Sequence, residues 1–340
     1  MAADILLALA GLALAGMTLS DVFETVVVPG GSRASLRVAR RLGAVLLPIW
    51  KAVRGRRRGL SGGFAPVILV GSFVIWIALL ALAFGLMAYA ARAHFEPRIE
   101  SLPEGIYLAG SSMMTVGPGK AETALGIGRW IVLGAGFCGL AVMTMAVTYL
   151  LQVQSGVGER DTGIIKLNTS AGDPPSAVTL LERLAALRNR GQLKDTLMEG
   201  RDWIATVRQS HSSHPTLIYF QSLGTGAGWP AALGAIMDAA LLAEHCIDDD
   251  DLYGPAVLLR NEGLRMARDL ALVAHLKPKD VGDDAPELKQ ASNRLETSGY
   301  PIRSNPDFGV MTAQRAEYRA YVDALANHLG KPAAVLVRQS

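Results

Sequence analysis

Three long apolar stretches constrain this chain more than any other feature, because each is long enough to cross a lipid bilayer. A membrane-spanning helix needs about 20 mostly apolar residues. Stretches of this length lie at about 5–28, 65–91 and 127–152. The apolar residues crowd into the first 152 positions. We therefore predict an all-α membrane protein with three transmembrane helices, followed by an all-α cytoplasmic domain at 153–340.

The first apolar stretch has two interpretations, a cleaved signal peptide and a retained helix. It begins Met-Ala-Ala-Asp, without the basic residues that open a signal peptide. Cleavage would also leave the Arg-rich loop that follows outside the cell, against the tendency of basic loops to remain in the cytoplasm. Residues 1–29 are therefore interpreted as an N-terminal transmembrane helix.

The distribution of charge predicts the direction of each helix. Residues 30–64 contain nine Arg or Lys and no Asp or Glu, whereas residues 153–340 contain 20 basic and 23 acidic residues. A basic loop between two membrane helices is typical of a cytoplasmic loop, and we expect no nucleic-acid partner. We predict a multi-pass protein of the cell (inner or plasma) membrane, with the N-terminus outside and the C-terminal domain in the cytoplasm.

The basic loop is amphipathic in part. Apolar and basic residues alternate there at roughly helical spacing. We predict an interfacial helix on the inner membrane surface, with membrane lipids as partners and lipid phosphates close to Arg56, Arg57 and Arg58. The alternative is that these arginines only determine topology. Asp21 and Glu24, near the inner end of the first segment, are expected to pair with Arg33 or Arg37.

A polar, Gly-rich stretch separates the second and third apolar segments. The residues before it, 102–114, are apolar but too few to cross the bilayer, and Pro103 suits the first turn of a helix. Residues 115–119 then read Thr-Val-Gly-Pro-Gly. Irregular backbone is tolerated at membrane depth only where protein covers it or where it lines a watery cavity. The order predicts a re-entrant pore loop, and the alternative is a Gly-Pro-Gly surface turn.

The motif TVGPG resembles the potassium-channel filter TVGYG, in the setting of the two-helix pore module of the bacterial potassium channel family. More faintly, residues 21–29 and 214–222 look like stretches of family members that have an additional N-terminal helix and a cytoplasmic tail. The resemblance implies a pore module at 65–152, with an outer helix at 65–91, a pore helix at 103–114, a filter at 115–119 and an inner helix at 127–152.

By this resemblance, the filter residues coordinate K⁺ or another monovalent cation, and no cofactor is expected. The coordinating oxygens would come from Thr115, Val116, Gly117 and Pro118, and Gly119 would let the chain leave the filter. Because one loop cannot enclose a pore, the resemblance also implies a homotetramer.

Two residues depart from the family's pattern. Pro118 stands where the family has Tyr or Phe, and it lacks a backbone N–H and holds φ at about −65°. Lys120 stands where the family usually carries Asp, and it would repel entering cations. These departures leave K⁺ selectivity open. The alternative function is a non-conducting membrane scaffold or sensor, with a degenerate pore and a cytoplasmic domain that binds a partner.

The predicted inner helix contains five further candidate residues. Gly134, Gly136 and Gly139 serve either close packing, which small residues usually do in membrane helices, or a hinge. Thr144 and Thr148 share one helical face. They either line an inner cavity or donate hydrogen bonds back to the helix backbone.

The C-terminal part has helical periodicity throughout. A Gly-rich stretch near 224 imitates the strand, loop and helix of a nucleotide-binding unit, but an acidic loop follows the helix where that unit needs another strand. No nucleophile–base pair stands out, so we expect no enzyme and no metal site, and leave an unidentified cytoplasmic ligand or protein partner open. Helices are predicted at 176–191, 193–210, 230–246, 254–276, 284–296 and 311–329.

Overall fold

Helices dominate the computed structural model, with 81% of the structure helical. Three helices are long and apolar enough to cross a membrane. The predicted all-α class with three membrane helices is therefore confirmed. The chain forms two compact units, Met1–Val153 and Gln154–Ser340. The structure describes residues 1–28, 38–54, 63–117, 122–123, 126–187, 190–221, 226–278, 282 and 284–338.

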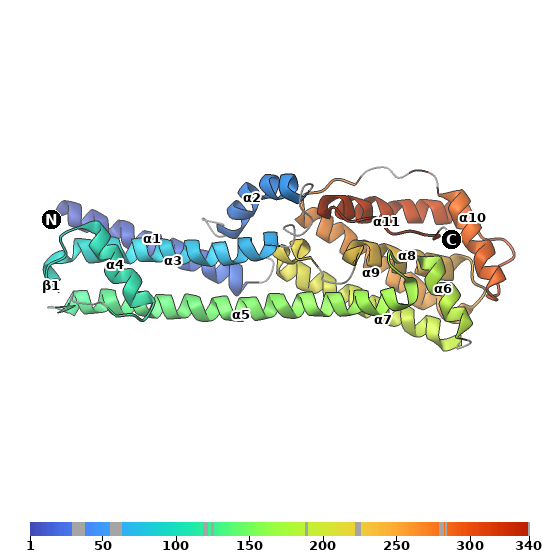
Figure 1. Cartoon of the computed structure of the whole chain (residues 1–340), viewed down its shortest axis with the longest axis horizontal. Coiled ribbons are helices and arrows are strands. Elements are labelled where there is room, and N and C mark those ends of the chain that lie inside the picture. The colour runs from blue at the N-terminus through green and yellow to red at the C-terminus, as the bar shows by residue number, and fades with distance from the viewer. Residues whose placement is uncertain are drawn as a thin grey trace. The chain divides into compact units, whose positions relative to one another are not determined.

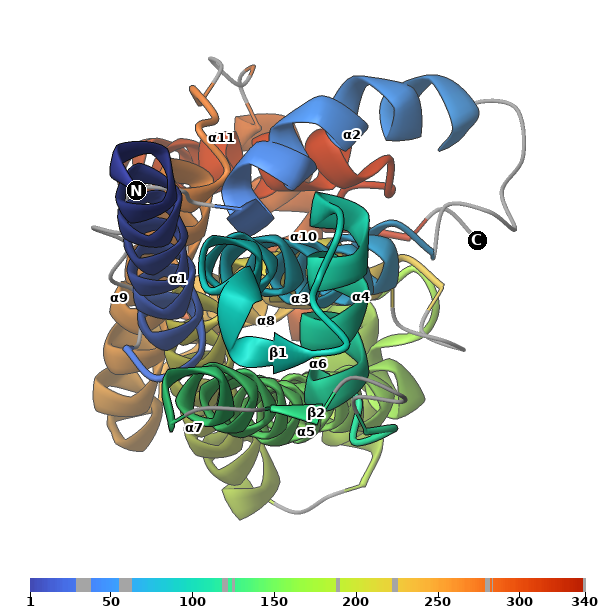
Figure 2. The same cartoon turned by 90° about the vertical axis from the view of Figure 1, so that its left-hand side faces the viewer.

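The first unit is built around α3, which contacts α1, α2 and α4 (Figure 1). Figure 2 shows α4 beside α3, and β1 next to its antiparallel partner β2. The elements are α1 (Ala2–Val26), α2 (Val38–Arg54), α3 (Phe64–Ala90), η2 (Arg92–His94), β1 (Phe95–Glu96), α4 (Leu102–Met113), β2 (Glu122–Thr123) and α5 (Gly126–Ala171).

The helix expected to end at 152 is much longer, because α5 continues to Ala171. Hydropathy marks where a helix leaves the apolar phase and not where its hydrogen bonding stops. The residues after 152 include no proline before Pro174. The helix ends where Gly172 adopts a φ of +83°, a conformation that glycine tolerates at helix ends.

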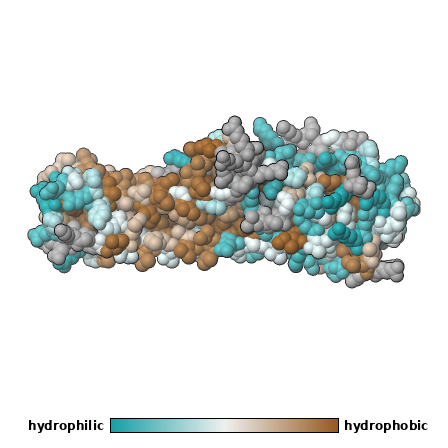
Figure 3. Space-filling model, viewed as in Figure 1, coloured by the Kyte–Doolittle hydropathy of each residue, from teal (hydrophilic) through white to brown (hydrophobic). Residues whose placement is uncertain are grey.

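Apolar side chains cover the outside of the first unit as well as its core. Figure 3 shows apolar surface over α1, α3 and α5. Phe137 and Trp130 on α5 are both mostly exposed, as are many leucines of α1. Exposed apolar surface on this scale is unfavourable in water and favourable against lipid chains. The first unit is therefore the membrane part of a helical integral membrane protein.

Polar side chains inside the first unit are bonded between helices. Asp21 of α1 is fully buried, and its Oδ2 accepts hydrogen bonds from Trp76 Nε1 of α3 at 2.7 Å and from the backbone N–H of Val38 of α2 at 3.2 Å. One carboxylate thus joins three helices. Arg33 and Arg37, the expected partners of Asp21 and Glu24, lie outside the described residues.

An ion pair joins the other ends of α1 and α3. Asp4, in the first turn of α1, pairs with Arg92, which follows α3. The two helices are therefore antiparallel, as the alternating topology predicts.

The second unit is a helical domain around α8, whose residues are buried from Gly228 to Glu244. It packs against α6, α9 and α11. The stretch that imitates a nucleotide-binding strand forms a 3-10 helix, η3, so that motif is absent there. The elements are α6 (Ala177–Ala186), α7 (Arg190–Ser213), η3 (Pro215–Tyr219), α8 (Gly228–His245), α9 (Asp250–Val273), α10 (Ala285–Thr297) and α11 (Phe308–Leu329).

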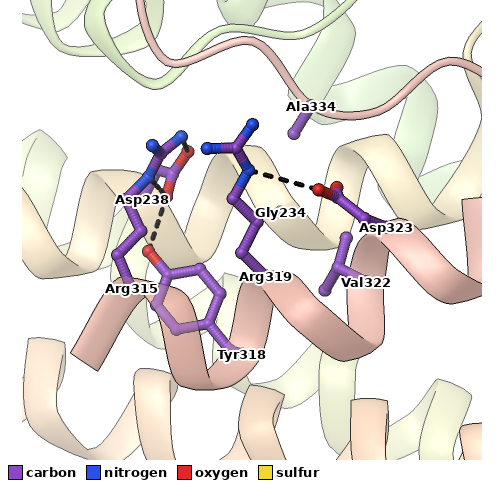
Figure 4. A pocket seen from close by; sticks show the side chains of 8 residues that line it. All are labelled: Gly234, Asp238, Arg315, Tyr318, Arg319, Val322, Asp323 and Ala334. Carbon is purple, nitrogen blue, oxygen red and sulfur yellow. Dashed lines mark hydrogen bonds and ion pairs between the residues drawn. The ribbon is translucent and has the colours of Figure 1, made fainter. Parts of the chain in front are cut away.

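Buried charges link α8 to α11. The Arg315 guanidinium donates to both carboxylate oxygens of Asp238, at 2.9 and 3.0 Å, and to Asp284 at 2.6 Å. Tyr318 donates to Asp238 as well, at 2.5 Å. Figure 4 shows Asp238, Arg315 and Tyr318 at a small pocket, together with the Arg319–Asp323 pair. Both arginines that line the pocket are thus paired with carboxylates.

The substitution Arg315→Met is expected to destabilise the chain by about 3–5 kcal/mol, because it leaves the buried Asp238 and Asp284 carboxylates without their cation. The matched control is Arg268→Met, which breaks an exposed pair with Glu317 and should cost less than about 1 kcal/mol. Urea unfolding of the full chain in detergent measures both. Equal losses for the two variants would contradict this assignment.

His211 of α7 is a second buried group with a consequence for stability. It is fully buried, and its Nδ1 lies 2.9 Å from the carbonyl oxygen of Val207. Burial, together with the nearby charges of Arg160 and His214, lowers the pKa of His211 from 6.5 to about 3. The folded state therefore keeps this imidazole neutral at pH values where the unfolded chain binds a proton.

We expect stability to fall as the pH drops below 6.5, since only the unfolded state gains the His211 proton. Between pH 7 and pH 5 this linkage amounts to about 2 kcal/mol. Urea unfolding at both pH values should show a loss in the native chain that exceeds the loss in His211→Gln by that amount. Parallel losses in the two proteins would mean that His211 titrates normally.

Candidate functional site

Two glycines bring α4 against α3. A Cβ atom on Gly85 would lie 2.7 Å from Cγ1 of Ile106, and one on Gly105 would lie 2.8 Å from the carbonyl oxygen of Gly85. Both distances are shorter than any normal contact, so glycine is required at both positions. Small residues allow membrane helices to approach closely and to gain dispersion energy in this way.

A third glycine brings α5 against the C-terminal end of α4. A Cβ atom on Gly139 would lie 2.7 Å from the Cα, Cβ and carbonyl oxygen of Met113. The other two candidates have more room, because a Cβ would lie 3.3 Å from Phe84 Cε1 at Gly134 and 3.5 Å from the Ser112 oxygen at Gly136. These contacts favour packing over a hinge.

The first residues of the predicted filter form the turn that ends α4. The N–H of Thr115 donates to the Ser112 carbonyl at 3.2 Å, and the N–H of Val116 donates to the Ser111 carbonyl at 3.0 Å. These two bonds make a Schellman motif, which needs a left-handed residue in the position of Thr115. The φ of Thr115 is +57°, as the motif requires. The N–H of Gly117 also donates to Ser111, at 3.3 Å.

Thr115 is strained in this conformation. Glycine normally occupies the left-handed position at a helix end, and a β-branched residue there is an outlier. Such strain costs about 1–3 kcal/mol, and strained residues gather at functional sites. Gly117 is also left-handed, with a φ of +94°. The strain falls on the first residue of the TVGPG motif.

The same turn aims carbonyl groups away from α4. In a trans peptide the C=O of one residue points opposite to the N–H of the next. Because the N–H groups of Thr115, Val116 and Gly117 all bond back to α4, the carbonyls of Met114, Thr115 and Val116 point the other way. Among the described residues, no N–H donates to these three oxygens. Val116 is 76% exposed.

The electrostatics of this turn suit a cation. Carbonyl oxygens carry partial negative charge, and the C-terminal end of α4 adds the negative end of its helix dipole. Among the described residues, no backbone N–H group competes with a cation for these three carbonyl oxygens. The arrangement can therefore replace part of the hydration shell of a monovalent cation.

The remaining predicted residues fall into two groups. Thr144 and Thr148 are exposed, and their Oγ1 atoms donate to the carbonyls of Leu140 and Thr144, at 2.9 and 3.1 Å. They thus bond back to the helix, which leaves their methyl groups outward. Five residues lie outside the described residues: Pro118, Gly119, Arg56, Arg57 and Arg58.

Sequence reasoning missed two contacts that α3 makes with its neighbours. The partner of Asp21 is Trp76, which lies 55 positions further along the chain. Gly85 and Gly105 form a second missed pair. A signal was present in both cases, since an acid inside a membrane segment needs a donor and small residues mark helix contacts. Neither signal predicts which residue on the other helix makes the contact.

Comparison with known proteins supports a membrane protein. The chain is 21% identical, over 282 residues, to "Uncharacterized membrane protein YdjJ" of Bacillus subtilis (strain 168), an alignment that covers 80% of each chain. No family model matches the sequence. No solved structure matches the fold.

We expect Gly139→Ala to destabilise the first unit by about 1–3 kcal/mol, because the added methyl group meets the backbone of Met113. The control Gly136→Ala has room for a Cβ and should be neutral or stabilising by up to about 1 kcal/mol. Denaturation of the full chain in mixed detergent micelles measures both. A larger effect at position 136 would contradict the contact with α4.

Proposed function

We propose that this chain is a potassium-channel-like membrane protein, in which four copies form a pore for passive conduction of K⁺ or another monovalent cation. The observation that carries the proposal is the end of α4. Three successive N–H groups bond back to α4 there, and the carbonyls between them are left without donors among the described residues. Backbone oxygens in this arrangement are what a carbonyl-lined cation filter requires.

The proposal makes α4 a re-entrant pore helix. Its C-terminal residue, Met113, contacts Gly139, which lies about 20 Å from the start of α5 at 1.5 Å per residue. The hydrocarbon core is about 30 Å thick, so the filter residues would lie inside it. The pairing of β1 with β2 supports this, because it closes the base of the segment that enters and leaves.

Conduction requires several copies of the chain. Tyr107, Met114 and Val116 present apolar side chains to the outside of one copy. Among the described residues, no N–H donates to the carbonyls of Thr115 and Val116. Four copies around an axis, as in the family that the motif resembles, would enclose them and cover these side chains.

The direction of the chain follows from its charges. The protein would lie in the cell membrane, with the basic loop between α1 and α3 on the cytoplasmic side and the N-terminus outside. The Asp4–Arg92 pair would then lie at the outer surface, and the second unit in the cytoplasm. This places the helical domain where it can bind an unidentified ligand or partner.

Ion flux through the full chain in liposomes tests the proposal. We expect flux that favours K⁺ and Rb⁺ over Na⁺. Gly117→Asp should abolish it, because an L side chain is strained at a φ of +94° and the new carboxylate would trap a cation. The matched control is Gly254→Asp, near the start of α9, where no atom lies within 4 Å of an added Cβ.

The same assay separates the alternatives. Equal flux of the three ions, lost in Gly117→Asp, would indicate a non-selective cation pore. No flux from either orientation of the protein would overturn conduction and favour the membrane scaffold.

Pro118→Tyr introduces the aromatic residue that the resembled family has at this position, and we expect it to raise the preference for K⁺ over Na⁺. An unchanged preference would mean that residue 118 lies outside the filter.

A further inference from the structure

The helix α2 has one apolar face that the protein covers. Trp50 stacks on Phe64 of α3, with ring centroids 4.8 Å apart and an interplanar angle of 21°. Leu42 inserts its Cδ2 into the notch at Gly71, 2.8 Å from the position that a Cβ would occupy. Both α3 residues lie in its first turns, so α2 packs beside the point where α3 begins.

A second apolar face of α2 is uncovered. It comprises Ala44, Val45, Pro48, Ile49 and Ala52, which we call the outer face. These residues are spaced by one and by three or four positions, so they form one stripe along the helix. All five are exposed, with Val45 at 65% and Ile49 at 57%.

Basic residues flank the outer face. Arg40, Arg41 and Lys51 are exposed. The sequence contains no Asp or Glu between Glu24 and Glu96, so neither α2 nor α3 supplies an acid to pair with them. An apolar stripe with a purely basic rim is complementary to a surface that offers both lipid chains and negative phosphates.

We propose that the outer face of α2 docks into the anionic lipid leaflet of the bilayer that α1 and α3 span, with Arg40, Arg41 and Lys51 on lipid phosphates. A second copy of this chain is a poorer occupant, because its own basic rim would repel the first. The proposal requires only that α1 and α3 cross the membrane. It does not depend on ion conduction.

The buried Asp21 carboxylate holds α2 in the orientation that this docking needs. It accepts from the N–H of Val38, at the start of α2, where the positive end of the helix dipole favours an anion. It also accepts from Trp76 of α3. Because α2 is held at Val38 and again at Trp50, its outer face is turned away from α3.

A fluorescent probe attached to the full chain in liposomes tests the location of the outer face. The probe is attached through Val45→Cys, in a background with Cys138→Ala and Cys246→Ala. The vesicles contain phosphatidylcholine and phosphatidylglycerol at three to one, with a doxyl quencher near the headgroup. We expect strong quenching at position 45. The matched control is a probe attached through Met198→Cys, an exposed position on α7, which should be quenched little.

A titration tests the charge requirement. Phosphatidylglycerol is added to the full chain in neutral detergent, and the thermal midpoint is followed. Removal of two basic residues by Arg40→Gln and Arg41→Gln should raise the half-maximal lipid concentration by about fivefold for each charge. The matched control, Arg201→Gln with Arg265→Gln, removes two exposed arginines of the second unit and should leave it unchanged.

Two results would overturn the proposal. An unquenched probe at position 45 would show that another surface covers the outer face, and self-quenching between labelled copies would identify that surface as a second chain. An equal response to phosphatidylcholine would remove the role of charge. Since neither readout involves flux, a protein that conducts nothing can still support lipid docking, and the two proposals fail separately.

Discussion

The contact between Gly139 of α5 and Met113 of α4 fixes the position of the candidate site along α5. It sets how far the short helix reaches along α5, and so where Thr115 lies relative to the apolar stretch. Gly85 and Gly105 make the same kind of contact with α3 on the other side. Close packing of small residues is the main attraction between helices in lipid, where burial of apolar surface contributes little. Three glycines therefore hold α4 between α3 and α5.

The need to hydrogen-bond backbone and buried polar groups explains two further features of the first unit, the turn after α4 and the contacts of Asp21. Inside a bilayer, every N–H needs an acceptor within the protein or in trapped water. Thr115, Val116 and Gly117 meet this need by donating to the last turn of α4, at the expense of strain at Thr115. Asp21 meets it with Trp76 and the start of α2. The turn after α4 and the junction of α1, α2 and α3 at Asp21 are two solutions to one constraint.

The sequence predicted the helices well, because their signals are local. Apolar runs and helical periodicity need only neighbouring residues, and the predicted pore helix at 103–114 differs by one residue at each end from α4. The length of α5 was not predictable from hydropathy, since the helix continues where its surroundings change from lipid to protein. The amphipathic loop was recognised, but its apolar residues divide between two faces, with Trp50 against α3 and Val45 exposed. Which residues turn inward depends on a neighbouring helix.

The sequence by itself determined the number of membrane helices, the all-α class, the basic loop and the TVGPG motif, because composition and spacing along the chain are sufficient for each. Tertiary structure alone decided that Gly139 meets Met113, that Asp21 bonds Trp76, and that the carbonyls after α4 lack donors among the described residues. These are contacts between segments far apart in the chain. Their partners are selected by distance and shape in three dimensions, which no local pattern encodes.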